Sequence, residues 1–222
     1  MRISHLFILL AASAMLTACD FLDEYNPNSV TVGNYYTSEE DIVASLNGVY
    51  TSLTQSYVAD NYHYFTDVRA NATVVTNSGA NSGIPYQFYN YTLTEENVYV
   101  YNRYSQLYKI ISRANTLFAH LGDVSYATPS ARDTYEAEAR FLRALSYYWL
   151  VTEWGDVPLV LKVLESTEEV RANNYRRPKA EIYQAIFDDL KYVTESPLLD
   201  VQPASACGKV SKAAAWALWG KA

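Results

Sequence analysis

The sequence predicts an all-α fold made of paired helices. Residues 94–121 and 129–154 each place apolar side chains at the helical spacing of three and four residues, and only a short connection separates them. Residues 178–195 and 208 onward repeat that arrangement. Because a short connection makes two long helices run antiparallel, each pair forms a hairpin, and stacked hairpins are typical of tetratricopeptide-like solenoids. The consensus pattern of such repeats is not matched, so this expectation depends on spacing.

Composition and charge limit the class of protein. Among 222 residues, 50% are hydrophobic and 18% are charged, which is enough apolar material for a buried core and untypical of disorder. The net charge of -7 provides no basic surface, so we exclude nucleic acid as a partner. The chain contains 21 tyrosines. Because a tyrosine ring joins an apolar face to a hydroxyl group, these residues suit contact with carbohydrate or peptide as well as packing between helices.

The N-terminus has the features of a lipoprotein signal peptide. Arg2 precedes an apolar run over residues 6–16, which is much shorter than the roughly 20 residues of a membrane-spanning helix. The run ends in LTAC, which looks like the lipobox where bacterial lipoprotein signal peptidase cuts before a diacylated cysteine. We therefore expect residues 1–18 to be removed and Cys19 to carry the lipid that holds the protein at a membrane. The alternative is an ordinary signal peptide that happens to contain a cysteine.

A tether and a first helix follow the anchor. Residues 19–36 contain the turn-forming sequences Asn-Pro-Asn and Gly-Asn without a sustained period, so they are expected to link the lipid to the folded domain. Thr37 and Glu40 then have the spacing of a capping box, and apolar residues follow on one side. We expect a helical domain over residues 37–222.

The stretch from residue 56 to residue 93 has no helical period and is rich in asparagine, glycine, serine and aromatic residues. Short alternating runs at Val74-Val75 and at residues 86–89 are typical of strands. We therefore expect a long irregular loop with a possible short hairpin. Loops of this length usually carry function, and this one is too aromatic to be disordered.

This loop also holds the candidate ligand-binding residues. A sugar ring has an apolar face that stacks on an aromatic ring, and a rim of hydroxyl groups that an amide or guanidinium group can bind. The loop interleaves side chains of both kinds. The candidates are Tyr62, Tyr64, Arg69, Asn71, Tyr86 and Tyr89. Packing within the loop is the alternative role for each of them.

The helix at 129–154 is the central element. Thr128 and Pro129 fit an N-cap and a first helical position, and Gly155 followed by Pro158 fits a stop. Apolar stripes cover most of its circumference, so it needs neighbours on two sides. The line expected to face solvent is Glu136, Arg140, Arg143 and Tyr147. On the apolar side, we expect Glu138 to pair with a cation such as Arg113 from the preceding helix.

The C-terminal part completes the second hairpin. Residues 159–177 are expected to form a loop, and Pro178 fits the first position of the helix that follows. The last helix, from residue 208, has an apolar face but neither a cap nor a glycine stop. We therefore expect the sequence to be the N-terminal part of a longer protein.

Support for an enzyme is thin. His63 and His120 lie in unrelated segments without the spacing of a zinc site. Neighbouring carboxylates such as Glu95 and Glu96 stand at helix starts or on solvated faces, and the sequence places no pair of them across a glycosidic bond. We expect no catalytic residue, no metal and no cofactor.

Several stretches resemble one family. EAEARFLRALSYYWLVTEWGDVPLV, from residue 136, is similar to the "EARFLRAL…Y…L…GDVPL" signature of the SusD/RagB family, the surface lipoproteins that work with a TonB-dependent transporter in nutrient uptake. ASLNGVYTSL, NRYSQLYKIISRANTLFAHL, RRPKAEIYQAIFDDLKYVTESPLL and GKVSKAAAWALWGKA resemble four further helices of that family. In the second of these, Tyr101 or Tyr104 replaces the usual tryptophan.

The resemblance implies a function as well as a fold. It implies a SusD-like α-solenoid at the outer membrane that binds oligosaccharide or polysaccharide and delivers it to a SusC-like transporter, without catalysis. In such proteins the ligand site is shallow and combines loops of the N-terminal half with the C-terminal half. Two alternatives stay open, a RagB-like protein that captures peptides and a helical-repeat scaffold that binds only proteins.

Overall fold

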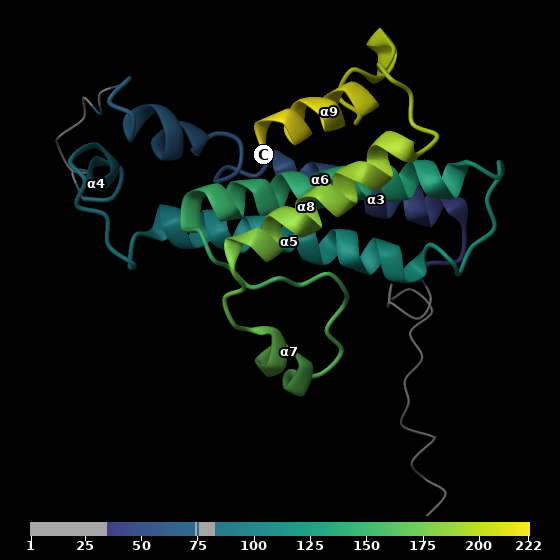
Figure 1. Cartoon of the computed structure of the whole chain (residues 1–222), viewed down its shortest axis with the longest axis horizontal. Coiled ribbons are helices and arrows are strands. Elements are labelled where there is room, and N and C mark those ends of the chain that lie inside the picture. Colours follow the sequence, from purple (N-terminus) through teal and green to yellow (C-terminus); the bar gives the residue numbers. More distant parts are fainter. Residues whose placement is uncertain (1–34, 74, 76–82) are drawn as a thin grey trace, which may run out of the picture. The chain divides into compact units, whose positions relative to one another are not determined.

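A computed structural model describes residues 35–73, 75 and 83–222. The expected signal peptide (1–18), Cys19, most of the tether and Val74 lie outside the described residues. The described elements are α3 (Glu39–Leu53), the π-helical turn η2 (Tyr64–Val68), α4 (Tyr86–Tyr89), α5 (Val98–His120), α6 (Ala131–Trp154), α7 (Thr167–Asn173), α8 (Lys179–Glu195), the 3₁₀ turn η3 (Ala204–Ala206) and α9 (Lys212–Lys221) (Figure 1). The predicted all-α fold is confirmed over these residues.

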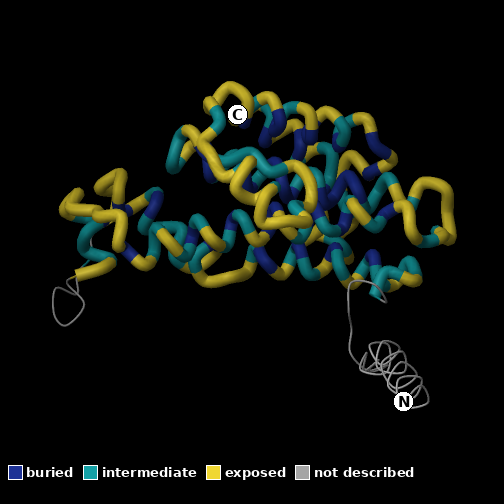
Figure 2. Tube along the Cα trace, turned by 90° about the horizontal axis from the view of Figure 1, so that it is seen from below, coloured by how far each residue is buried: buried dark blue, intermediate teal, exposed yellow. Residues whose placement is uncertain are grey.

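The long helices pack as hairpins. In residues 36–222, α6 packs against α5 on one side and α8 on the other, α3 covers α5 and α6, and α9 packs on α8 (Figure 1). Each helix buries an apolar stripe in one shared core, represented by Ile42, Leu107, Leu142, Ile186 and Leu218. The buried positions gather along the packed helices in Figure 2. None of the described helices is both long and apolar enough to cross a membrane.

Caps fix where the helices begin and end. Ser38 caps α3, because its side chain accepts from the backbone N–H of Asp41 while the Asp41 carboxylate accepts from the Ser38 N–H. The capping box therefore lies one residue after the predicted Thr37. The predicted stop of α6 is confirmed at Gly155, whose φ of 75° favours glycine.

The strand predicted at residues 86–89, as part of a possible short hairpin, is wrong. Residues Tyr86–Tyr89 form the single helical turn α4, which Pro85 precedes. The described part of the chain contains one isolated bridge, between Val157 and Arg177, and no strand. The predicted loop at 159–177 also contains the short helix α7, capped by Ser166.

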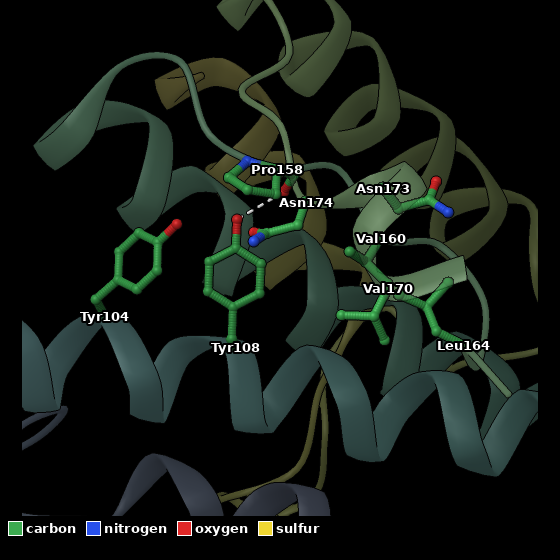
Figure 3. A pocket seen from close by; sticks show the side chains of 8 residues that line it. All are labelled: Tyr104, Tyr108, Pro158, Val160, Leu164, Val170, Asn173 and Asn174. Carbon is green, nitrogen blue, oxygen red and sulfur yellow. Dashed lines mark hydrogen bonds between the residues drawn. The ribbon is translucent and has the colours of Figure 1, made fainter. Parts of the chain in front are cut away.

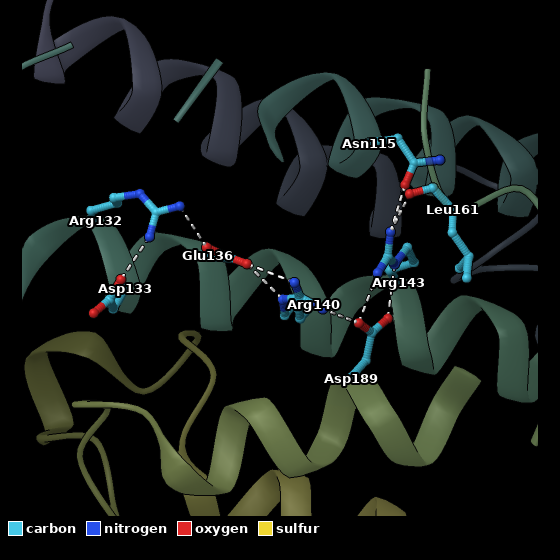
Figure 4. A network of polar contacts seen from close by, with 8 residues as sticks. All are labelled: Asn115, Arg132, Asp133, Glu136, Arg140, Arg143, Leu161 and Asp189. Carbon is cyan, nitrogen blue, oxygen red and sulfur yellow. Dashed lines mark hydrogen bonds and ion pairs between the residues drawn. The ribbon is translucent and has the colours of Figure 1, made fainter. Parts of the chain in front are cut away.

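The prediction of a solvent-facing line on α6 is also wrong. Glu136, Arg143 and Tyr147 are buried, because α8 and the chain after α6 cover that face. Asp189 of α8 accepts from Arg143 Nε and Nη2 at 2.8 Å each, and from Arg140 Nη1 at 2.8 Å (Figure 4). Charged groups on α6 thus find their partners inside the molecule, and Arg140 joins Glu136 to the same network.

Glu138 is buried as expected, but its predicted partner is wrong. The Tyr50 hydroxyl donates to the Glu138 carboxylate at 2.6 Å, and Lys209 Nζ lies 3.8 Å away. Arg113 donates to the Gly48 carbonyl at 2.8 Å instead. The cation that faces Glu138 therefore comes from the segment before α9, and the contact joins α3 and α6 to that segment.

We expect Glu138→Gln to change how stability depends on pH. Burial raises the pKa of the Glu138 carboxyl above its ordinary 4.5, with Tyr50 and Lys209 opposing that effect. As pH rises above about 4.5, the unfolded chain releases this proton first, so the folded state loses stability until its own carboxyl ionises. Glutamine has no proton to lose. Urea unfolding at a series of pH values from 4 upward should show that the unfolding free energy of the variant increases relative to that of the unaltered protein. A difference between the two proteins that stays constant with pH would contradict a raised pKa for Glu138.

Candidate functional site

An aromatic lobe forms where the predicted loop meets the ends of α5 and α6. It consists of η2, α4 and the first turn of α5, packed around Phe65, Val68 and Phe88. The Phe65 and Phe88 rings meet edge to face, with centroids 4.9 Å apart. Phe65 also approaches Trp154 of α6 at 6.3 Å. Such ring pairs add to the stability from buried area, so the described parts of the loop form an ordered structure built on the helix ends.

Arg103 anchors the lobe to the hairpin. Its guanidinium group is fully buried and bonds Glu153 of α6 through Nε and Nη2, both at 2.6 Å. Arg103 Nη1 also donates to the carbonyls of Tyr57 at 3.0 Å and Val58 at 3.3 Å. The guanidinium group also makes cation–π contacts with the rings of Tyr62, Phe65 and Trp149. One cation therefore ties the incoming loop to both α5 and α6.

A cavity of about 290 Å³ opens beside this anchor, and we call it the lobe pocket. Its lining residues are Phe65, Arg69, Phe88, Leu93, Thr94, Val100, Glu153 and Trp154. Burial raises the pKa of Glu153, while Arg103 and, more weakly, Arg69 oppose that effect. The pocket therefore combines aromatic walls with a guanidinium donor, a hydroxyl group and a carboxylate acceptor. This combination can hold a ligand that has an apolar face and a hydroxyl rim.

The structure brings some of the predicted ligand residues to this pocket and separates others. Arg69 lines it. Tyr64 packs inside the lobe against Phe88 and Tyr99, at centroid distances of 5.8 and 5.3 Å. Tyr62 lies against Arg103, with the cation 4.8 Å from its ring centroid. These positions give Tyr64 and Tyr62 supporting contacts with the lobe.

The other predicted residues lie at the surface of the lobe. Tyr86 and Tyr89 stand on α4 with ring centroids 5.5 Å apart. Asn71 is exposed and has a φ of 57°, a conformation that asparagine tolerates better than most residues. Nearby, the Tyr91 hydroxyl donates to the Arg69 carbonyl at 2.7 Å, which fixes the backbone that carries Arg69.

The sequence reasoning missed Glu153 and Trp154. Both belong to the last turn of α6, just before Gly155. One signal could have pointed to them, because an acidic residue at a helix C-terminus faces the negative end of the helix dipole and needs a cation nearby. Glu153 has that cation in Arg103, fifty residues earlier in the chain.

The comparisons with known proteins identify the family. A SusD-like family model described as "Starch-binding associating with outer membrane" matches residues 20–221, and the chain belongs to this family. SusD-like protein P2 of Formosa agariphila is 27% identical over 216 residues, which are 97% of this chain and 41% of that protein. A SusD-like protein of Bacteroides ovatus is 25% identical over 87% of this chain and 35% of its own length. The chain thus spans about two fifths of these relatives.

Solved structures have the same fold. A laminarin-binding SusD-like protein is 28% identical with a TM-score of 0.71, and the match covers 84% of this chain and 40% of that one. A SusD-like protein of Bacteroides fragilis has the same TM-score at 22% identity, over 84% of this chain and 35% of that one. The likeness to the second structure concerns the fold alone.

Proposed function

We propose that this chain is the N-terminal part of a cell-surface glycan-binding protein, which holds a neutral oligosaccharide or polysaccharide in the lobe pocket and does no bond chemistry. The observation that carries the proposal is the lobe pocket itself, where Phe65, Phe88 and Trp154 stand beside Arg69 and Glu153. Phe65 and Phe88 are buried and support the lobe. The half-buried ring of Trp154 is therefore the one that stacks on the apolar face of a sugar, while Arg69 and Glu153 bind its hydroxyl rim. The similarity to a laminarin-binding relative supports a glycan as the ligand.

The family supports the setting in which this binding takes place. Its description associates starch binding with the outer membrane. Together with the LTAC sequence before residue 20, this favours a lipid on Cys19, a surface location and a domain order of signal peptide (1–18), tether (19–36) and helical domain (37–222). In this setting the protein passes its glycan to a SusC-like TonB-dependent transporter. The rest of the longer protein supplies the remainder of the shallow site.

Arg69→Ala is the substitution that tests the lobe pocket. Arg69 is exposed, so its loss leaves the fold intact, whereas a hydrogen bond from a charged donor contributes about 1.5–3 kcal/mol. Affinity for the bound glycan should fall about tenfold or more in isothermal titration calorimetry with laminarin, starch and other neutral polysaccharides.

Arg176→Ala provides the matched control, because Arg176 is also an exposed arginine and lies outside the lobe pocket. It should bind as the unaltered protein does. If the full-length protein binds no neutral glycan, or Arg69→Ala binds it unchanged, the proposal fails. Release of reducing sugar by the purified protein would overturn its non-catalytic part.

A further inference from the structure

A row of hollows follows one face of α5. Val100, Tyr104 and Tyr108 are spaced four residues apart, so their side chains lie on one side of the helix. Val100 lines the lobe pocket, and Tyr104 and Tyr108 line a second hollow of about 160 Å³. Tyr108 with Ile111 and the following turn lines a third, of about 330 Å³. At 1.5 Å of rise per residue, Val100 and Tyr108 are about 12 Å apart along the axis, so the hollows form a line.

The middle hollow has an aromatic floor and an uncharged lining. The two tyrosines rise from α5 toward Pro158 and Asn174 (Figure 3). The aliphatic side chains opposite them come from the chain between α6 and the end of α7, namely Val160, Leu164 and Val170. Besides the two tyrosine hydroxyls, the polar side chains of this hollow are the amides of Asn173 and Asn174, and none of its lining residues is charged. Its chemistry suits a neutral ligand with an apolar face.

Hydrogen bonds hold the chain segment that forms the wall of this hollow, so the wall exists before a ligand binds. The Tyr108 hydroxyl donates to the Pro158 carbonyl at 2.6 Å (Figure 3). Tyr147 donates to the Val160 carbonyl at 2.9 Å and accepts from the Val160 N–H at 2.7 Å. Buried Asn115 and Arg143 hold the same segment through the carbonyls of Val160 at 3.0 Å and Leu161 at 3.1 Å (Figure 4). A preformed wall loses little conformational entropy when a ligand binds.

Aromatic rings connect the lobe pocket with the middle hollow. Trp154, which lines the lobe pocket, meets Tyr104 edge to face with centroids 5.3 Å apart. Tyr104 is in turn 4.8 Å from Tyr108. The ring that lines the lobe pocket is therefore in contact with the two rings that line the middle hollow, and these three rings form one continuous series.

We infer that these hollows are successive subsites of one binding track for an extended oligosaccharide, which runs from the lobe pocket along α5 past Val170. This inference rests on the proposed function and specifies its ligand as a chain of several neutral sugar units. Each hollow pairs an apolar wall with polar side chains: Arg69 and Glu153 in the first, Asn173 and Asn174 in the second, Ser112 and Lys162 in the third. A repeating pair of features matches a ligand whose every unit has an apolar face and a hydroxyl rim.

A peptide fits the track less well. An extended peptide gains its affinity from a strand edge, and the described residues beside the track form none. A helical peptide needs an apolar groove without interruption, whereas polar side chains interrupt this one at every hollow. The observations therefore favour a saccharide.

Val170→Trp tests the track without touching the lobe pocket. Val170 is 46% exposed at the mouth of the middle hollow, so a larger ring there fills the hollow from outside. Val201→Trp is the matched control, because Val201 is 73% exposed and lies away from all three hollows. The probes are the disaccharides and hexasaccharides of the laminarin, starch, cellulose, xylan and mannan series, titrated into the full-length protein, with thermal melting to show that each variant is folded.

The unaltered protein should bind the hexasaccharide of one series at least tenfold more tightly than its disaccharide. Val170→Trp should remove most of that difference and leave disaccharide binding unchanged, while Val201→Trp should change neither. Equal affinity for the two lengths, or an unaffected Val170→Trp, overturns the track and leaves the lobe pocket standing. If no probe of any series binds, the proposed function fails as well.

Discussion

Replacing Asp189 with alanine is expected to lower the free energy of unfolding by about 3–5 kcal/mol. Asp189 is 2% exposed and is the common acceptor for Arg143 and Arg140, which reach it from α6 (Figure 4). Removal of its carboxylate leaves Arg143, itself 5% exposed, without its acidic partner. An uncompensated buried charge is unfavourable by several kcal/mol, and here it lies at the interface of α6 and α8.

Asp188→Ala is the matched control for this prediction. The residue is the sequence neighbour of Asp189, carries the same charge and is exposed, with its carboxylate accepting from Gln184 at 2.9 Å. Its loss should change the unfolding free energy by no more than about 0.5 kcal/mol. Urea denaturation followed by circular dichroism separates the two variants. Equal losses in both would mean that the network around Arg143 does not stabilise the fold.

The same network explains why the sequence predicted the helices correctly but predicted the wrong environment for one face of α6. Periodicity and caps are local signals, so α5, α6 and α8 could be predicted within a few residues of their bounds. A line of charged side chains at helical spacing, however, does not reveal from the sequence alone whether that face contacts water or an oppositely charged residue of another helix. The partner of Arg143 is Asp189, 46 residues further along the chain, and no local pattern connects them.

The lobe pocket likewise contains one part that the sequence suggested and another part that it did not. The composition of the loop made Arg69 a candidate, because an arginine among aromatic residues is recognisable in sequence, and Arg69 lines the lobe pocket. The other half of the lobe pocket comes from Glu153 and Trp154, which are contributed by another element and become neighbours of Arg69 only when α6 packs against α5. The predicted strand at residues 86–89 failed for a related reason. Four residues are too few for periodicity to distinguish a strand from a helical turn.

Arg103→Met is expected to lower both the stability of the protein and its affinity for glycan. The substitution keeps an unbranched apolar chain but removes the bidentate partner of Glu153, whose side chain is 11% exposed. Breaking such a pair lowers the unfolding free energy by about 3–5 kcal/mol. It also frees the carbonyls of Tyr57 and Val58, so the segment that leads into the lobe loses this attachment to α5. Denaturation and calorimetry on one preparation should show the two losses together, whereas Arg69→Ala should lose affinity alone.

Adding Glu153→Leu to Arg103→Met separates the two roles of the pair. A buried ion pair can often be replaced by apolar residues with little loss, because both charges then stay out of the low-dielectric interior. The double variant should therefore recover most of the lost unfolding free energy. It should not recover glycan affinity, since Glu153 itself lines the lobe pocket. If affinity recovers together with stability, Glu153 acts only as the partner of Arg103. The assignment of its carboxylate as a group that binds the glycan would then be wrong.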